Sequence, residues 1–243
     1  MVVQCDVLGD SFIACLDLAD GREIWRAPRK DVPTWSTPTL VKVGDRTEIL
    51  ANGWHHLGAY DFANGKEIWR FDGGGDVPVP TPIVAGNLGV FTSAHGSGNP
   101  IRAIRLDALG DLNPKGGPTN AAVVWQQPRK GNYMQTPILV GDLLYDCLDT
   151  GDVTCFDAKS GAIRYSQRIG SGEGFTASPV SDGKNLYLTS EIGNVYVIPA
   201  TGTFSVSATN TLGETCLSTS AISEGTLFYR TRHELVAIGA ANK

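Results

Sequence analysis

The sequence has few cysteines, no long apolar run and no excess of one charge, and each of these absences excludes a class of protein. Its five cysteines are too few and too scattered for a disulfide framework. No apolar run approaches the roughly 18 residues of a membrane helix, so no membrane span is expected. Basic and acidic residues are interspersed at a net charge of −5. Because no basic stripe results, nucleic acid is not an expected partner.

Four of the cysteines fall on the arms of two predicted hairpins, Cys5 with Cys15 and Cys147 with Cys155. A cross-strand bridge within each hairpin is one alternative. The other is a free thiol, and we favour it because an unpaired cysteine usually behaves as a small buried hydrophobe.

Long helical patterns are also absent, and no secretion signal is expected at the first residues. The first residues, Met1 to Gln4, lack the basic and apolar regions of a secretion signal, so the sequence does not predict a compartment. A hydrophobic fraction of 42% is enough for a packed core, and 29 Gly with 13 Pro suit many short strands joined by turns. The composition therefore indicates an all-β chain.

One motif recurs along the chain: a hydrophobic residue, Asp, three residues, Gly, three residues and Trp. Its clear copies are Leu16–Arg26, Tyr60–Arg70 and Phe156–Tyr165, the last with Tyr in place of Trp. Weaker copies lie at Ile198–Val206 and at Arg105–Asp107, which is rejoined at Trp125 after an insertion. Repeats of this period stack on one another because a single copy cannot bury its apolar face alone.

Each repeat is predicted to be an antiparallel meander of four strands, A to D. A Thr-Pro or Ser-Pro pair opens most copies, and short apolar pieces separated by Gly turns follow. Six units result, with about 22 strands in a single domain, 1–243, because the first unit lacks strand A and the last lacks strand D. The units cover about 1–30, 36–75, 80–130, 135–172, 177–214 and 218–243.

These copies resemble the AxDxxTGxxxW repeat of the PQQ-like (pyrroloquinoline-quinone-like) β-propellers. The resemblance implies an all-β propeller of four-stranded blades. It also implies that the aromatic residue of strand D and the Gly of the CD turn dock neighbouring blades. The aromatic residues at this position are Trp25, Trp69, Trp125 and Tyr165.

Members of this family are longer, with seven or eight blades, and are periplasmic or secreted. The chain is similar to the C-terminal part of such a protein. Because its end units do not complement each other, either the chain closes as a small distorted ring or its open blade edges pair with a second copy. We favour the second alternative, a homodimer.

The family includes quinone-dependent dehydrogenases and assembly scaffolds that hand unfolded chains along. The resemblance implies that the dehydrogenases hold their cofactor with a disulfide between adjacent cysteines. No two cysteines are adjacent here, so we expect no bound PQQ and no other cofactor. A divalent metal is the one alternative.

The meander places the BC turns and the DA connections on one face, called here the BC/DA face. All four histidines fall on its turns, with His55 and His56 in the second unit, His95 in the third and His233 in the sixth. Carboxylates lie at the fourth and fifth BC turns, at Asp149 and Glu191. The opposite face has short Gly turns, apart from the insertion Ala108–Ala122, which we interpret as a flexible loop. The BC/DA face is therefore the predicted binding site.

Two functions compete for this face. The first is binding of a protein or a small polar ligand, for which Arg129, Tyr133, Trp35 and Gln135 supply charge, stacking and hydrogen bonds. The second is metal-assisted hydrolysis of an ester, lactone or phosphoester. For the second function, His56 and His95 are candidate ligands or catalytic groups, together with Asp149, Glu191 or His233.

Overall fold

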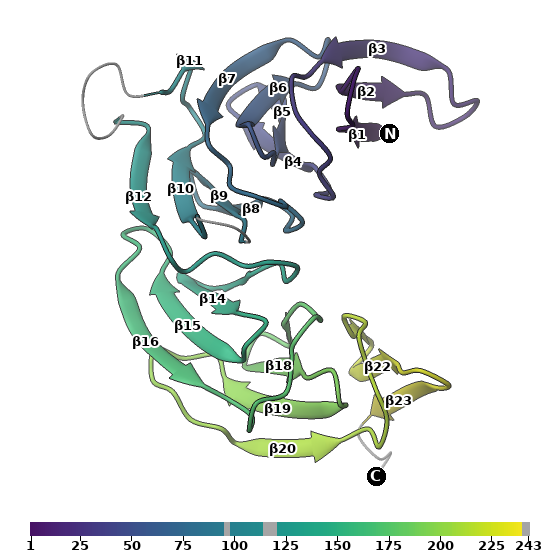
Figure 1. The fold of residues 1–243 in the computed structure, drawn as a ribbon, viewed down its shortest axis with the longest axis vertical. Coiled ribbons are helices and arrows are strands. Elements are labelled where there is room, and N and C mark those ends of the chain that lie inside the picture. The colour runs from purple at the N-terminus through teal and green to yellow at the C-terminus, as the bar shows by residue number, and fades with distance from the viewer. Residues whose placement is uncertain (95–97, 114–120, 240–243) are drawn as a thin grey trace. The chain divides into compact units, whose positions relative to one another are not determined.

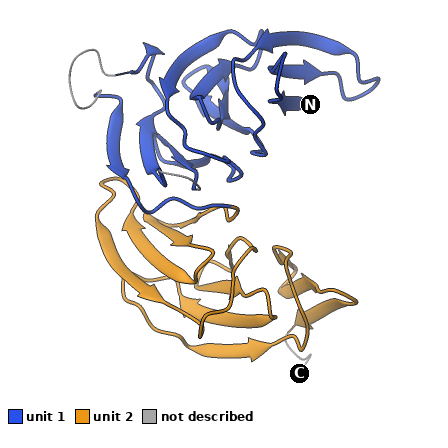
Figure 2. Ribbon diagram, viewed as in Figure 1, with its two compact units in different colours: residues 1–133 blue, residues 134–243 orange. Residues whose placement is uncertain are grey.

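The computed structural model describes residues 1–94, 98–113 and 121–239, and these residues form six sheets in which the strands are antiparallel except for one parallel pair (Figure 1). None of them forms a helix long and apolar enough to cross a membrane. The chain divides into two compact units, Met1–Tyr133 and Met134–Lys243 (Figure 2). Each unit holds three sheets, numbered here as blades 1 to 6 in chain order. The all-β propeller architecture predicted from the repeat is confirmed.

Unit 1 holds blades 1 to 3 (Figure 1). Blade 1 consists of β1 (Val2–Cys5), β2 (Phe12–Leu16) and β3 (Glu23–Pro28). Blade 2 consists of β4 (Thr39–Val43), β5 (Arg46–Ala51), β6 (His56–Asp61), β7 (Glu67–Asp72) and a fifth strand, β11 (Gly110–Asp111). Blade 3 consists of β8 (Ile83–Ala85), β9 (Leu88–Thr92), β10 (Ile101–Arg105) and β12 (Val123–Gln127).

Unit 2 holds blades 4 to 6. Blade 4 consists of β13 (Ile138–Val140), β14 (Leu143–Cys147), β15 (Asp152–Asp157) and β16 (Ile163–Arg168). Blade 5 consists of β17 (Val180–Ser181), β18 (Asn185–Thr189), β19 (Asn194–Pro199) and β20 (Ala208–Thr211). Blade 6 consists of β21 (Ala221–Ser223), β22 (Thr226–Arg230) and β23 (Leu235–Gly239).

The end blades have three strands each, as the repeat phase predicted: blade 1 begins at strand B and blade 6 stops at strand C.

The insertion of blade 3 was predicted to be only a loop, and this was wrong for its first part. Strand β11 pairs in parallel with β7, with Gly110 opposite Trp69 and Asp111 opposite Arg70. The Gly-rich centre of the insertion, 116–118, lies outside the described residues.

Apolar cores lie between neighbouring blades, because successive residues of a strand point to opposite faces of its sheet. On β5, the side chain of Ile49 packs with Ile13 of blade 1. The next residue, Leu50, packs with Phe91 of blade 3. A third core joins blades 4 and 5, and it includes Cys155.

The docking aromatics share one position in the ladder between strands C and D. Each pairs with a small residue of strand C: Cys15 with Trp25, Ala59 with Trp69, Ala103 with Trp125 and Cys155 with Tyr165. A bulge follows each of these pairs. Trp69, Trp125 and Tyr165 are buried as predicted, whereas Trp25 is only half-buried.

All five cysteines are free, so the favoured alternative is confirmed. In both predicted hairpins the two cysteines are not cross-strand neighbours, because the residue opposite each of them is a different one. Cys5 pairs with Phe12, and Cys155 pairs with Tyr145.

Candidate functional site

The BC turn of blade 2 carries two exposed aromatic side chains at its tip. Trp54 is 37% exposed, and its ring centroid lies 6.1 Å from that of His55 at an interplanar angle of 29°. This pair is called here the Trp54–His55 tip. The next residue, His56, is the first of β6 and turns inward, with only 3% of its surface exposed. The two neighbouring histidines therefore have different environments.

The backbone of the tip is fastened to two other loops. The amide of His55 donates to Oδ1 of Asp31 at 3.0 Å. The amides of Gly73 and Gly74 donate to the carbonyls of His55 and Trp54 at 2.9 and 3.0 Å. A Cβ atom on Gly74 would lie 1.6 Å from the carbonyl oxygen of Gly53, so only glycine allows this approach. The tip is thus held in one position by hydrogen bonds to its backbone.

A buried ion cluster lies behind the tip and fixes Asp31. Nε of Arg29 lies 2.8 Å from Oδ1 of Asp6, and its Nη2 lies 3.3 Å from Oδ2 of Asp31. The side chains of all three residues are fully buried. Nη1 of Arg29 donates to Oη of Tyr60 at 2.8 Å. Because a buried charge is costly unless it is paired and hydrogen-bonded, these contacts hold the loops of blades 1 and 2 together.

His56 completes this cluster without adding a charge. Its Nε2 lies 3.2 Å from Oη of Tyr60, and its Nδ1 lies 4.0 Å from Oδ2 of Asp31. Burial, together with the nearby charge of Arg29, lowers the pKa of His56 to about 4. The ring is therefore neutral at physiological pH and takes part as a hydrogen-bonding group.

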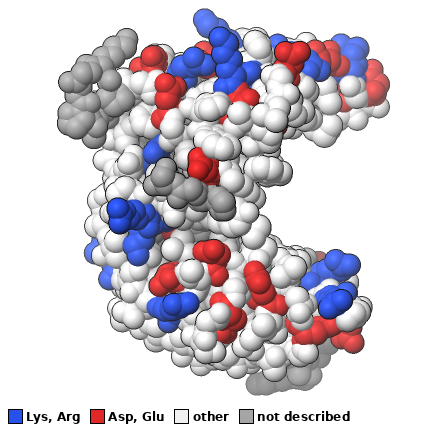
Figure 3. Space-filling view, in the orientation of Figure 1, with Lys and Arg blue, Asp and Glu red and all other residues white. Residues whose placement is uncertain are grey.

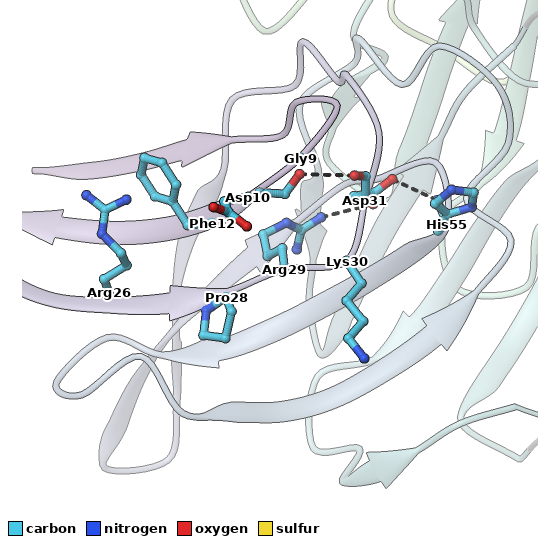
Figure 4. Close-up of a pocket in the computed structure, with 10 residues that line it drawn as sticks. Gly9, Asp10, Phe12, Arg26, Pro28, Arg29, Lys30, Asp31 and His55 are labelled. Carbon is cyan, nitrogen blue, oxygen red and sulfur yellow. Dashed lines mark hydrogen bonds and ion pairs between the residues drawn. The ribbon is translucent and has the colours of Figure 1, made fainter.

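Three hollows adjoin the tip, and His55 lines each of them. The largest, about 700 Å³, lies between Gly9–Phe12 and Arg26–Asp31 of blade 1 (Figure 4). Figure 4 shows Asp31 between Arg29 and His55. The other two measure about 310 and 380 Å³. Small-molecule pockets have volumes of this order.

Charges of both signs are interspersed over the face drawn in Figure 3. Lys30 and Asp10 both line the largest hollow. The guanidinium of Arg26 lies 3.7 Å from the ring centroid of Phe12 and pairs with Glu23 at 2.6 Å. This hollow thus offers apolar and mixed polar groups to a ligand.

The sequence-predicted site residues of unit 1 are spread over several loops. Trp35 is 59% exposed on the connection into blade 2, and its amide donates to the carbonyl of Pro78 at 3.1 Å. Arg129 is exposed and forms a bridge with Asn99, while Tyr133 is half-buried. His95 lies outside the described residues.

The predicted residues of unit 2 take different roles. Gln135 is fully buried, and its amide nitrogen donates to the carbonyl of Phe175. Asp149 is exposed, and half-buried Glu191 accepts a hydrogen bond from Thr176. Nδ1 of exposed His233 lies 2.8 Å from Oε2 of Glu214. Across the part of the chain that the structure describes, no three His, Cys, Asp or Glu side chains gather as a metal site would require.

Two residues of this region were not singled out from the sequence, Trp54 and Arg102. Trp54 stands directly before His55 and His56 at a predicted BC turn, and this position was a usable signal. Arg102 lies on a buried strand, β10, where successive side chains point to opposite faces of the sheet. It therefore shares a face with Ile104, which is fully buried. A charged residue on such a face was the second usable signal.

Comparisons with known proteins agree with this architecture. A family model described as outer membrane protein assembly factor BamB matches residues 9–243. No curated protein matches the chain in sequence. BamB from Moraxella catarrhalis has a similar solved structure, with a TM-score of 0.66 and 14% identity over 95% of this chain and 69% of that one.

Two other solved structures are similar in fold. The computationally designed Ika8 protein has a TM-score of 0.60 at 13% identity over 91% of this chain. Quinohemoprotein alcohol dehydrogenase from Comamonas testosteroni has a TM-score of 0.61 at 11% identity over 87% of this chain. The chain spans 64% and 41% of their respective lengths. At these identities the likeness concerns the fold alone.

Proposed function

Because the chain belongs to the family described as outer membrane protein assembly factor BamB, we propose that it is an assembly scaffold that holds an extended polypeptide. The polypeptide lies against the BC/DA face of unit 1. A fold of this type hosts both enzymes and binding proteins, so the proposal rests on the surface of this chain.

The observation that carries it is the Trp54–His55 tip. Binding energy in protein interfaces concentrates on a few residues, and Trp is enriched among them. Trp54 is exposed, yet its backbone carbonyl is held by the amide of Gly74 at 3.0 Å. A rigid anchor loses little conformational entropy on binding, which favours affinity.

The surroundings of the tip suit an extended chain. Leu8 and Trp35, on other loops of the same face, are 83% and 59% exposed. The three hollows that adjoin His55 can each receive a side chain of a polypeptide that crosses the tip. Recognition of this kind depends on apolar anchors with a polar rim and is tolerant of partner sequence.

The test measures binding of fluorescently labelled peptides that span single strands of an outer-membrane β-barrel protein. Fluorescence anisotropy should show saturable binding to the wild-type chain. Trp54→Ala should weaken it at least tenfold, which corresponds to about 1.4 kcal/mol. The matched control is Leu18→Ala, because Leu18 is 85% exposed on the CD turn of blade 1, at the opposite face. Equal binding by Trp54→Ala and the wild type would rule out this role for the tip.

Metal-assisted hydrolysis is the alternative function that the sequence predicts for the same loops. It requires His56 or His95 to hold a divalent metal that activates a water molecule. Metal analysis of the purified chain, with ester and phosphoester turnover before and after chelation, tests it. Chelator-sensitive turnover that a folded His95→Ala variant loses would favour the hydrolase over the scaffold.

A further inference from the structure

A hollow of about 310 Å³ in unit 1 contains a buried arginine. Its walls are the Trp54–His55 tip, Pro100, Asp76, Arg102 and three glycines. Arg102 is only 8% exposed, so more than nine-tenths of its surface is buried. The hollow lies where the BC turns of blades 2 and 3 meet, and its volume matches that of a small ligand or of one side chain.

The guanidinium of Arg102 is only partly satisfied by the protein. Nε donates to Oε1 of Gln126 at 3.1 Å, and Nη1 donates to the carbonyl of Gly73. The ring of Phe71 lies 5.0 Å from Cζ. A guanidinium has five N–H donors, and Nη2 has no hydrogen-bond acceptor within the described residues.

Arg102 also lacks a counter-charge. The described residues include no carboxylate within 4.0 Å of its nitrogens, whereas Arg29, which is also buried, has two acidic partners. Burial lowers the pKa of Arg102 to about 10, so the side chain stays charged at neutral pH. Its hydrogen bonds to neutral oxygens do not balance the charge of the buried guanidinium, and an anion that enters the hollow supplies the missing counter-charge.

We propose that this hollow is a carboxylate-binding site in which Nη2 of Arg102 receives one carboxylate oxygen and the Trp54 ring covers the adjacent apolar part of the ligand. This site goes beyond polypeptide docking and does not depend on it. Its ligand is a monocarboxylate, which is either a free small molecule or the C-terminal end of a peptide.

Asp76 sets the selectivity of the site. Asp76 lines the same hollow, and among the described residues it forms no ion pair with Arg102. It repels a second negative charge, so a dianion such as inorganic phosphate binds more weakly than a monocarboxylate. A neutral or cationic group at the other end of the ligand is favoured.

The experiment follows the indole N–H resonance of Trp54 by NMR during titration of the full chain with sodium propionate. We expect a saturable shift with a dissociation constant on the order of 1 mM, as suits a single charged pair. Propionamide, the neutral isostere, should give no saturable shift. Absence of a shift with propionate, or an equal shift with propionamide, would overturn the proposal.

Two variants locate the site. Arg102→Gln should abolish the propionate shift, while Arg105→Gln, its exposed neighbour on β10, should leave it unchanged. If Arg102→Gln fails to fold, Asp76→Asn still decides, because removal of the repelling charge should tighten propionate binding at least threefold. An unchanged affinity in Asp76→Asn, or wild-type binding by a folded Arg102→Gln, contradicts the assignment.

Peptides then distinguish the two sources of carboxylate. A short acetylated peptide is compared with its C-terminally amidated form. Tighter binding of the free-acid peptide than of propionate identifies a chain terminus as the ligand. Equal or weaker binding identifies a free small carboxylate. If the chain binds propionate but binds no barrel-strand peptide at Trp54, the scaffold proposal fails and the carboxylate site stands.

Discussion

The ring of Trp25 in blade 1 packs directly on the backbone of Gly65 in blade 2. A Cβ atom on Gly65 would lie 2.4 Å from Cε3 of Trp25, and the φ angle of Gly65 is +74°. The indole nitrogen of Trp25 donates to the carbonyl of Phe62 in the same turn at 2.9 Å. The recurring Asp-x3-Gly-x3-Trp motif thus supplies both halves of the contact, the aromatic from one blade and the glycine from the next.

Gly65→Ala should therefore destabilise the chain more than a change in backbone conformation alone would. The left-handed conformation costs an L-residue about 1 to 2 kcal/mol, and the clash with Trp25 adds to this. Gly21→Ala is the matched control, because Gly21 has the same φ of +74° at the same motif position with nothing within 4 Å of its Cβ. Urea denaturation of both variants measures the difference. Equal losses of unfolding free energy would show that the contact with Trp25 contributes nothing.

Replacement of Trp69 by Ala should lower the free energy of unfolding by about 3 to 5 kcal/mol, since a large buried aromatic leaves a cavity. Trp69 is 1% exposed and meets Phe91 edge-on at 5.8 Å. Its indole nitrogen has no hydrogen-bond partner in the described structure, so the loss is one of apolar packing. Trp25→Ala, at a half-buried position, should cost clearly less in the same denaturation experiment. The reverse order would contradict the packing argument.

His56 makes the stability of unit 1 depend on pH. Its pKa is about 4 in the folded chain, below the ordinary histidine value of 6.5, so the unfolded chain binds more protons between these two pH values. The contribution of neutral His56 to the free energy of unfolding should therefore be fully present above pH 6.5. It should be lost as the pH falls towards 4, by up to about 3 kcal/mol. Denaturation at pH 7 and 4.5 measures the loss. It should shrink in His56→Gln and stay unchanged in His233→Gln, whose ring is exposed.

Thiol reactivity should separate Cys5 from the other cysteines. Cys5 is half-buried, whereas the remaining four are buried. Burial raises the pKa of Cys147, and it raises that of Cys155 to about 11, so neither is a reactive thiolate in the native chain. A thiol-specific chromophore at neutral pH should give one fast equivalent, which Cys5→Ser removes. More than one fast equivalent in the native chain would contradict this assignment.

The fold was largely predictable from the sequence because its determinants are local. A turn glycine, a strand D aromatic and alternating apolar residues occur within one repeat, and their spacing alone located the blades. Trp69 could be assigned to the interior from its motif position. Strand β11 could not be predicted, because two residues carry no periodic signal and their partner β7 lies some 40 residues earlier.

The candidate site was predictable only to the level of a face. The phase of the repeat placed His55 and His56 at a BC turn, but it could not show that one is exposed and the other buried. In the cluster of Arg29 with Asp6 and Asp31, Asp6 follows β1 whereas the other two residues follow β3. No spacing in the sequence predicts that these loops meet. Charges that meet only in the folded chain give no local pattern to read.

The parallel pairing of β11 with β7 has a consequence for how unit 1 unfolds. Strand β11 follows β10 of blade 3 in sequence, yet it forms the outer edge of the blade 2 sheet, and the amide of Leu112 continues the pairing to the carbonyl of Arg70 at 2.8 Å. Blade 3 cannot open fully without exposing that edge. Blades 2 and 3 should therefore exchange their amide hydrogens as a single cooperative unit, with matching opening free energies along β7 and β10.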